Sequence, residues 1–392
     1  MVIFISVSST SFADEIIIDN DDISISNNEI EYFADDYSTN ERLQPYLSGF
    51  LTSNFEINLA QPNKTINLRA TKAYTVNGLP VEKHIQKSYV GSKYIYVSQS
   101  DDKITYLSRY TINGATATYK DHMVLNGFGH NQTLEVYNHN GKTYILIGCK
   151  ANTDSKWGTS YYTMQVGRIQ YSPGTTISKY TKIARIVRLD CANTSATPFD
   201  TIDTTSKDYI EEKVNNVVKR MDAALSSDKT KLVLAVRSIY GKIQYSYYNF
   251  NTINNLLDSV DGESVNYISC VNNISIKNAC YFSCVQTGNQ RVLPNSSCQG
   301  IDFTNAYSVY IAGGVGGQQP KIAKMIKNNS GGYTYSYCIN VTNTISGELP
   351  EIEGIQNATD YLYFVLCPSK KSTSECIYSL DKSVIDEAVG AI

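Results

Sequence analysis

The amino-acid sequence predicts an all-β protein, a five-bladed β-propeller preceded by a short N-terminal extension. Three observations predict this class. Tyr occurs 31 times among many Thr, Ile and Val residues, which favour strands, and charged residues make up only 18% of the chain. A pattern of polar residues, a short turn and an apolar strand recurs along the sequence. The turns carry residues typical of hairpins, such as Asn140-Gly141.

The recurring pattern is found five times, with irregular spacing. The copies are "HIQKSYVGSKYIYVSQS" (84–100), "QTLEVYNHNGKTYILIG" (132–148), "RMDAALSSDKTKLVLAV" (220–236), "SCQGIDFTNAYSVYIAGG" (297–314) and "PEIEGIQNATDYLYFVL" (350–366). Between copies there is room for four strands, as a propeller blade requires. The innermost strand of each blade would line a central channel, and alternation would send every second side chain toward it. Two β-sandwiches are the alternative, but they need no polar group at the same place in each repeat.

One stretch departs from this strand pattern. In "DYIEEKVNNVVKRMDAAL" (208–225), apolar residues recur at helical spacing. We therefore expect a short helix that ends near Lys219, with extended chain from Met221 onward.

The N-terminal part divides into two segments before the main domain. Residues 1–13 resemble the apolar and cleavage regions of a secretory signal, with small residues at Ser11 and Ala13 but no basic leader. A buried strand is the alternative. Residues 14–45 form an acidic extension, and residues 46–392 form the predicted propeller domain. No other segment is apolar over a length that crosses a bilayer, so we expect a secreted, extracellular protein without a transmembrane segment.

Charge is distributed unevenly along the chain. Residues 14–41 contain ten Asp or Glu and no Lys or Arg, so the remaining residues carry a net charge of +7 against −3 for the whole chain. A mildly basic body suits a protein that meets polyanions such as teichoic acids. A solvated acidic tail without a specific role is the alternative.

The chain contains nine cysteines, an odd number. At least one would stay unpaired after export, and connectivity cannot be read from the sequence. Cys367 and Cys376 flank a short polar segment and are the candidates for a disulfide across a hairpin. No spacing typical of a zinc site is present, so the sequence predicts no metal and no cofactor.

Polar residues of the repeats are the candidates for a functional site. Glu135 and Asp222 are candidate catalytic carboxylates, because a pair of carboxylates at the channel is what glycoside hydrolysis requires. Hydrogen bonding to the neighbouring blade is the alternative role and has more weight. Trp157, Tyr245, Tyr247 and Tyr248 offer rings on which sugars could stack, or which could be buried instead. The predicted binding residues are His130, Gln132, Glu135, Asp222, Gln299, Asp302, Glu351, Glu353 and Trp157.

The repeats also resemble those of the helveticin J family, the large bacteriocins of lactic acid bacteria. The resemblance covers most of residues 80–370. It is carried by an ordered set of motifs, of which none is diagnostic alone. The set comprises "VGSKYIYVSQ" (90–99), "GHNQTLEVY" (129–137), "KIARIVRLD" (182–190), "DAALSSDKTKLVLAV" (222–236), "YNFNTIN" (248–254), "QGIDF" with "VYIA" (299–312) and "EIEGIQ" (351–356).

This resemblance implies a secreted antibacterial protein that acts on the envelope of related bacteria. The family's His before Gln or Glu is present as His130 and His84, whereas Arg220 and Leu349 stand at equivalent places. A role for a ring of histidines is therefore not supported. We expect a monomer without enzymatic activity that binds cell-wall polysaccharide or teichoic acid and no nucleic acid. A glycan hydrolase that uses channel carboxylates and a non-toxic carbohydrate-binding or adhesion protein are the alternatives.

Overall fold

Strands make up most of the molecule in the computed structural model, which describes residues 62–153, 160–200, 217–328, 332–370 and 372–390. The described residues contain few helices. The α-helices among them are α4 (Phe250–Val260), α5 (Ile274–Ala279) and α6 (Lys382–Gly390), and the 3-10 helices are η2 (Tyr180–Lys182), η3 (Leu189–Cys191), η4 (Gly288–Gln290) and η5 (Pro294–Ser296). The all-β class predicted from the sequence is confirmed.

Each of the five repeats forms an antiparallel hairpin. At Asn140 and Gly141 both φ angles are positive (50° and 74°), as a tight hairpin turn with the favoured twist requires. The paired strands are β3 (Ile85–Val90) with β4 (Tyr94–Asp101), β7 (Leu134–His139) with β8 (Lys142–Ala151), β12 (Val218–Leu225) with β13 (Lys231–Ser238), β17 (Ile301–Phe303) with β18 (Val309–Gly313), and β21 (Glu351–Asn357) with β22 (Tyr361–Cys367).

Further strands extend these hairpins into four sheets. The orders are β1-β20-β19-β18-β17, β15-β11-β9-β8-β7, β12-β13-β14-β16 and β21-β22-β23-β2-β6-β5-β4-β3, with β10 beside β6 in the last sheet. The remaining strands are β1 (Thr65–Leu68), β2 (Thr71–Asn77), β5 (Ile104–Asn113), β6 (Thr116–Asn126), β9 (Thr163–Gln170), β10 (Thr176–Ile177), β11 (Ala184–Val187), β14 (Ile243–Asn249), β15 (Tyr267–Ser269), β16 (Cys280–Gln286), β19 (Lys321–Lys327), β20 (Tyr333–Val341) and β23 (Ser374–Asp381).

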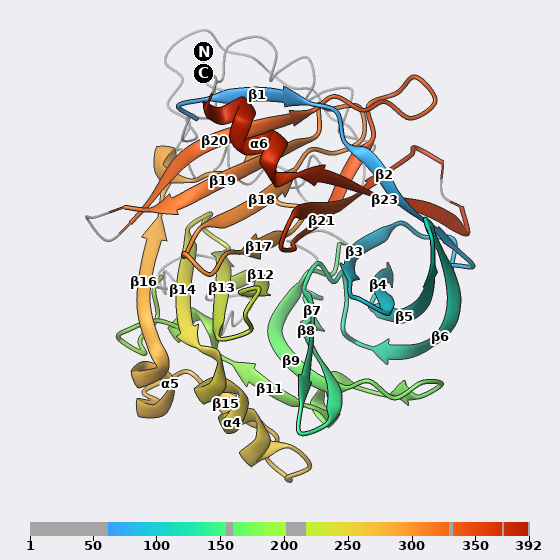
Figure 1. Cartoon of the computed structure of the whole chain (residues 1–392). Coiled ribbons are helices and arrows are strands. Elements are labelled where there is room, and N and C mark those ends of the chain that lie inside the picture. The colour runs from blue at the N-terminus through green and yellow to red at the C-terminus, as the bar shows by residue number, and fades with distance from the viewer. Residues whose placement is uncertain (1–61, 154–159, 201–216, 329–331, 371, 391–392) are drawn as a thin grey trace, which may run out of the picture.

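The first strand of each repeat hairpin lies at an end of its sheet order, and these five end strands meet. Contacts join β3 to β7, β7 to β12, β12 to β17, β17 to β21 and β21 back to β3. Figure 1 shows the sheets arranged around the place where these strands come together. The ring closes through the two ends of the chain, because β2 near the start pairs antiparallel with β23 near the end.

Hydrophobic side chains fill the space between adjacent sheets. One cluster joins Leu146 of β8 to Leu234 of β13 and to Ile253 and Leu257 on α4. Helix α4 follows β14 directly and begins where the Asn249 side chain accepts the Thr252 N–H group. Tyr245, Tyr247 and Tyr248 are buried in these clusters, so they offer no surface on which a sugar could stack.

Two local predictions are tested by these residues. Strand β12 begins at Val218, three positions before Met221, so the chain is extended earlier than predicted; the rest of the expected helix, residues 208–216, lies outside the described part. The disulfide between Cys367 and Cys376 is wrong. The Cys367 sulfur lies 3.9 Å from Glu375 Oε2, and alternation along β23 turns Cys376 to the other face of the sheet. All nine cysteines are free.

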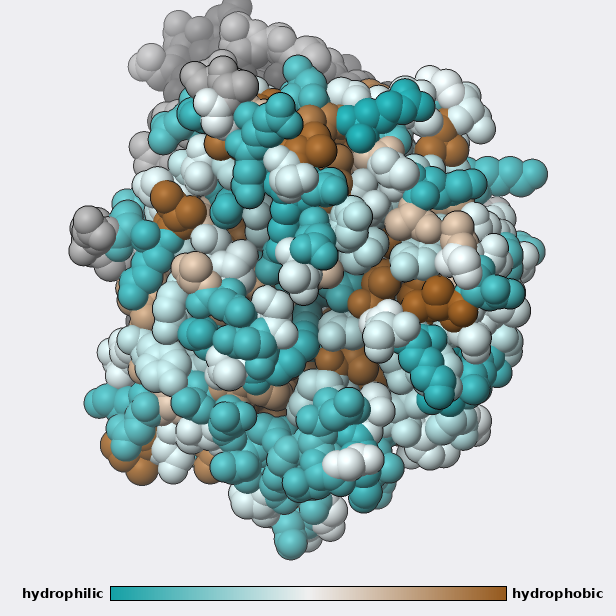
Figure 2. Space-filling view, in the orientation of Figure 1, coloured by the Kyte–Doolittle hydropathy of each residue, from teal (hydrophilic) through white to brown (hydrophobic). Residues whose placement is uncertain are grey.

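Three further predictions remain untested. The signal-like segment, the whole acidic extension and Trp157 lie outside the described residues. Among the helices that the structure describes, none has both the length and the apolar character needed to span a membrane. On the face seen in Figure 2, hydrophilic residues predominate and hydrophobic residues stand in small separate groups.

Candidate functional site

The polar residues predicted from the repeats come together where the five end strands meet. Gln132, Glu135, Asp222, Gln299, Asp302 and Glu353 are all buried, and they interact with residues of other strands. They form two groups, which we call the lysine cluster and the arginine cluster.

The lysine cluster consists of Lys87, Glu135, Lys229 and Asp302. Lys87 Nζ donates to Glu135 Oε1 and to the Ile301 carbonyl oxygen, both at 3.1 Å, and its side chain is 0% exposed. Lys229 Nζ donates to the second oxygen of the same carboxylate at 3.2 Å. Glu135 is therefore neutralised by two ammonium groups, which link β3, β7 and β17 with the β12–β13 turn.

Asp302 stands next to this ion-pair group. Its Oδ1 accepts the Phe303 N–H group at 2.5 Å and its Oδ2 accepts the Asn357 N–H group at 2.6 Å, so it holds β17 against β21. Burial and the charge of Glu135 raise the pKa of Asp302 to about 7, and the nearby lysines offset part of this effect.

Asp302 makes stability depend on pH. Since its pKa is about 3.9 in an unfolded chain and about 7 in the folded protein, the folded state holds the proton more tightly. The stabilising contribution is complete below about pH 4 and is lost as the pH rises through about 7. We expect Asp302→Asn to remove this dependence of the free energy of unfolding on pH, whose slope is at most on the order of 1.4 kcal/mol per pH unit. Urea unfolding of both proteins from pH 4 to 8 measures the slope. Equal slopes in the two proteins would show that Asp302 is not the group responsible.

The arginine cluster consists of Arg220, Asp222, Gln132, Gln299, Glu351 and Glu353. Arg220 binds Asp222 in a bidentate pair, at 2.9 Å from Nε and 3.1 Å from the terminal nitrogen, and also donates to Gln132 Oε1. Gln132 Nε2 donates to Glu353 Oε2 at 2.7 Å and to Gln299 Oε1 at 3.0 Å. Gln299 Nε2 donates in turn to Glu351 Oε1 at 2.6 Å. This chain of hydrogen bonds joins residues from four repeats.

His130 lies beside the arginine cluster through an aromatic neighbour. Its ring stands 5.3 Å from that of Tyr162, over which the Arg220 guanidinium lies at 4.5 Å. Part of His130 is exposed, but its Nε2 is buried without a hydrogen-bond partner among the described residues. Burial and the charge of Arg220 lower the pKa of His130 to about 3, so the imidazole is neutral at physiological pH. A base with so low a pKa removes protons poorly at neutral pH.

Both clusters have the chemistry of buried structural networks. The candidate catalytic carboxylates, Glu135 and Asp222, are paired with cations and closed off from solvent. Burial and the charge of Glu351 raise the pKa of Glu353 well above its ordinary value, and the amide of Gln132 holds this carboxyl group. The sequence predicted that these acids and amides converge. It missed Lys87 and Lys229, whose positions on apolar strands and turns gave no sign of ion pairing.

A groove outside the centre was also missed. It has a volume of about 400 Å³ and is lined by Arg69, Ala70, Thr71, Lys72, Asn343, Thr344 and Tyr378. Arg69 and Lys72 are exposed, and Tyr378 is half-buried. Asn343 fixes the floor by accepting the Ala70 N–H group at 2.7 Å and donating to the Ala70 carbonyl oxygen at 3.0 Å. We call this feature the basic groove. Its residues come from the β1–β2 turn and the start of β2, from the segment after β20, and from β23, and these parts are far apart in the sequence.

Several solved structures show a distant likeness to this chain. Hydrazine synthase of Kuenenia stuttgartiensis is 9% identical with a TM-score of 0.34, over 72% of this chain and 62% of that chain. The WD40 domain of Toxoplasma gondii coronin is 8% identical with a TM-score of 0.32, over 79% of this chain and 85% of that chain. A gluconolactonase of Xanthomonas campestris is 8% identical with a TM-score of 0.31, over 74% and 68%. TM-scores this low carry no argument about function.

Sequence comparison is more informative. No curated protein matches the chain. The sequence pattern of the family described as "Bacteriocin helveticin-J" matches residues 63–374, which is most of the chain and includes all five repeat hairpins. Most motifs that suggested this resemblance lie on the end strands and on the strands paired with them, whereas residues 182–190 cover β11 and the start of η3 and residues 248–254 cover the end of β14 and the start of α4. The chain belongs to the helveticin J family of bacteriocins.

Proposed function

We propose that this protein is a secreted antibacterial protein that binds an anionic glycopolymer of the cell envelope of target bacteria. Membership of a bacteriocin family supports the antibacterial role. The basic groove is the observation that carries the binding role. The signal-like residues 1–13 and the net charge of +7 outside residues 14–41 agree with export and with a polyanionic partner.

The basic groove has the chemistry that a wall teichoic acid or a related sugar phosphate polymer requires. Exposed Arg69 and Lys72 provide positive charge for phosphate groups. The half-buried ring of Tyr378 offers an apolar face next to them, and Thr71 and Thr344 add hydroxyl groups that can hydrogen-bond to sugars. Asn343 holds the backbone of this groove in place through its two bonds to Ala70.

We infer that the scaffold is a five-bladed propeller. The count is supported if the long sheet is divided at the parallel pairing of β2 with β6, which covers only Thr75 to Asn77. The division gives β3 to β6 as one blade and β21, β22, β23 and β2 as another, besides the three remaining sheets. The blade made of β21, β22, β23 and β2 combines an early strand of the chain with three late ones, and the basic groove lies at this blade.

We infer that binding, and no covalent reaction, underlies the activity. Glu135 already contacts two lysines and Asp222 one arginine, so neither carboxylate is free to act on a substrate without breaking a buried ion pair. The predicted binding residues at the centre are then residues that shape the scaffold, and recognition takes place at the basic groove.

The double variant Arg69→Ala/Lys72→Ala tests the binding role. We expect about tenfold or greater loss of binding to cell walls that retain teichoic acid, because each cation near a polyanionic surface contributes about 1 kcal/mol. Co-sedimentation at moderate salt, with walls stripped of teichoic acid in parallel, measures this. The killing of sensitive bacteria should fall with the binding.

A matched control is Lys142→Ala/Lys277→Ala, which removes the same charge from two exposed positions on the β7–β8 hairpin and α5. It should bind as the unchanged protein does. If both double variants lost wall binding equally, the net charge of the protein, and not the basic groove, would account for the binding. No retention on either wall preparation would reject the binding proposal, and release of reducing ends from the walls would favour a hydrolase instead.

A further inference from the structure

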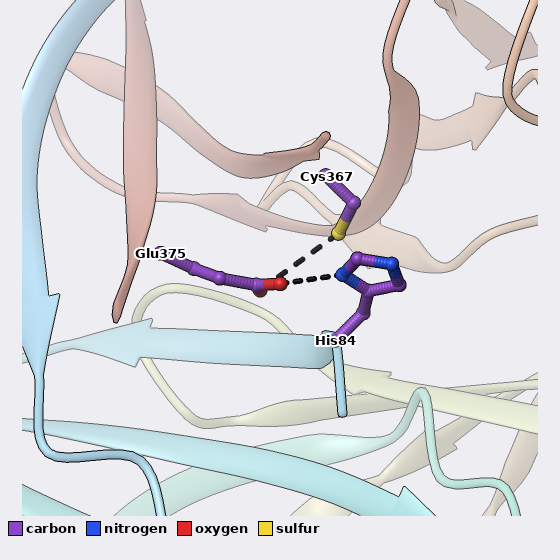
Figure 3. A group of neighbouring side chains, drawn as sticks. All are labelled: His84, Cys367 and Glu375. Carbon is purple, nitrogen blue, oxygen red and sulfur yellow. Dashed lines mark hydrogen bonds and ion pairs between the residues drawn. The ribbon is translucent and has the colours of Figure 1, made fainter. Parts of the chain in front are cut away.

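Three side chains with metal-ligand atoms meet near the closure of the ring. His84 directly precedes β3, Cys367 ends β22, and Glu375 lies in β23. Their ligand atoms all lie within 4.8 Å of one another. His84 Nδ1 is 2.5 Å from Glu375 Oε1, and the Cys367 sulfur is 3.9 Å from Glu375 Oε2. Figure 3 shows the three side chains pointing toward one another.

This cluster is largely closed off from solvent. Cys367 and Glu375 are buried, whereas the His84 side chain is 14% exposed. A cation bound to the sulfur would displace the thiol proton. The site therefore brings together, in a small and mostly buried space, the ligand types of a transition-metal site.

We propose that His84, Cys367 and Glu375 bind a zinc-class divalent transition-metal ion that links the start of β3 to the β22–β23 hairpin. Nitrogen, sulfur and carboxylate oxygen in one small site are the ligands that Zn²⁺ takes, and hard cations such as Mg²⁺ or Ca²⁺ avoid the sulfur. The partly exposed side of His84 leaves an approach for the ion and for a water molecule as the fourth ligand.

The geometry requires only a small adjustment. Ligand atoms around a tetrahedral zinc ion stand about 3.4 Å apart, given metal–ligand distances of about 2.1 Å. The distance of 3.9 Å from the sulfur to Glu375 Oε2 is close to this value, and the 2.5 Å contact between His84 Nδ1 and the other carboxylate oxygen, Oε1, would open as the ion replaces the shared proton. Glu375 Oε2 also accepts the Ile85 N–H group at 2.8 Å, which orients the carboxylate.

The position of the site gives the ion a structural role. His84 and Glu375 are 291 positions apart, and they belong to the two parts of the chain that close the ring. An ion that binds only the folded state stabilises it by mass action. The sequence analysis predicted no metal, because the three ligands follow no short spacing and meet only through the pairing of strands that are far apart in the chain.

Cobalt binding tests the ligand set directly. Co²⁺ added to the metal-free, reduced protein should produce a sulfur-to-cobalt charge-transfer band in the near ultraviolet and visible bands typical of a tetrahedral ion, at one equivalent. Cys367→Ser should remove the charge-transfer band, and His84→Asn should weaken Co²⁺ binding at least about tenfold. Cys376→Ser is the matched control, since Cys376 follows Glu375 but faces away, and it should keep the whole spectrum.

Thermal unfolding with and without Zn²⁺ gives a second readout. Zn²⁺ should raise Tm for the unchanged protein and for Cys376→Ser, and this rise should disappear in Cys367→Ser and in His84→Asn. His84 is partly exposed, so its variant is expected to fold even if Cys367→Ser does not. A charge-transfer band that survives in Cys367→Ser, or no cobalt spectrum in the unchanged protein, would overturn the proposal.

Discussion

Replacing Lys87 by methionine is expected to lower the free energy of unfolding by about 3–5 kcal/mol, the cost of removing one partner from a buried ion pair. The Lys87 side chain is 0% exposed and lies between Glu135 on β7 and the Ile301 carbonyl oxygen on β17. Methionine fills most of the same volume but donates no hydrogen bond. Glu135 would then depend on Lys229 alone, and the carbonyl oxygen would lose its donor. Three end strands would lose a shared contact.

The measurement is urea unfolding followed by circular dichroism. Lys142→Met, the same change at an exposed position, is the control and should lie within about 0.5 kcal/mol of the unchanged protein. The double variant Lys87→Met/Glu135→Gln should be less destabilised than the sum of its single variants, because it removes both charges together. Equal stability of Lys87→Met and Lys142→Met would show that the lysine cluster contributes nothing to the fold.

The sequence contained most of the information on the strands. The five repeats were recognisable because a hairpin is local: its turn, its polar strand and its apolar strand are neighbours in the chain. All five became antiparallel hairpins, and the Asn140-Gly141 turn adopts the conformation that its residues favour. The class and the family followed from this local pattern.

Features that depend on the exact register of a hairpin, or on burial, could not be predicted in the same way. The proposed bond between Cys367 and Cys376 failed because the register of β22 against β23 places Glu375, and not Cys376, beside the Cys367 sulfur. The early start of β12 at Val218, which pairs with Ser238 in the β12–β13 hairpin, shows strand pairing overriding the helical pattern at this position. Sequence position also did not reveal whether tyrosines face solvent, and Tyr245, Tyr247 and Tyr248 are buried between sheets.

In the candidate site, too, some features could be predicted from the sequence and others could not. Gln132, Gln299 and Glu353 come from equivalent places in different repeats and lie near one another, as equivalent positions in a ring of similar units would. Their cationic partners are not repeated, so Lys87 and Lys229 could not be inferred from self-similarity. The basic groove combines the β1–β2 turn with residues more than 270 positions later, as the pairing of Asn343 with Ala70 shows. Such a site becomes visible only after the ring is closed.

Gly354→Ala is expected to destabilise the protein by about 3 kcal/mol or more, because overpacking and backbone strain act together. Gly354 has a φ of +55°, and a Cβ atom there would lie 2.7 Å from Lys87 Cα and 2.8 Å from the Gln86 carbonyl oxygen. Both obstacles belong to the backbone of β3, so no side-chain rotation relieves them. A Cβ atom added at Gly300 would in turn lie only 2.9 Å from the Cα atom of Gly354. The backbone of β21 therefore packs directly against the backbone of β3 and against the residue that precedes β17.

Two control glycines separate the causes. Gly316→Ala meets no atom within 4 Å and has no positive φ, so we expect no loss. Gly141→Ala also meets nothing within 4 Å but has a φ of +74°, and it should cost only the backbone strain of about 1 kcal/mol. Urea unfolding of the three variants ranks them by the free energy of unfolding that each one loses. If Gly354→Ala were no worse than Gly141→Ala, the strands β3, β17 and β21 would not pack as tightly as described. A large difference instead shows that these neighbouring strands leave no room for one added carbon atom, which agrees with a proposed binding role for the basic groove rather than for the space between them.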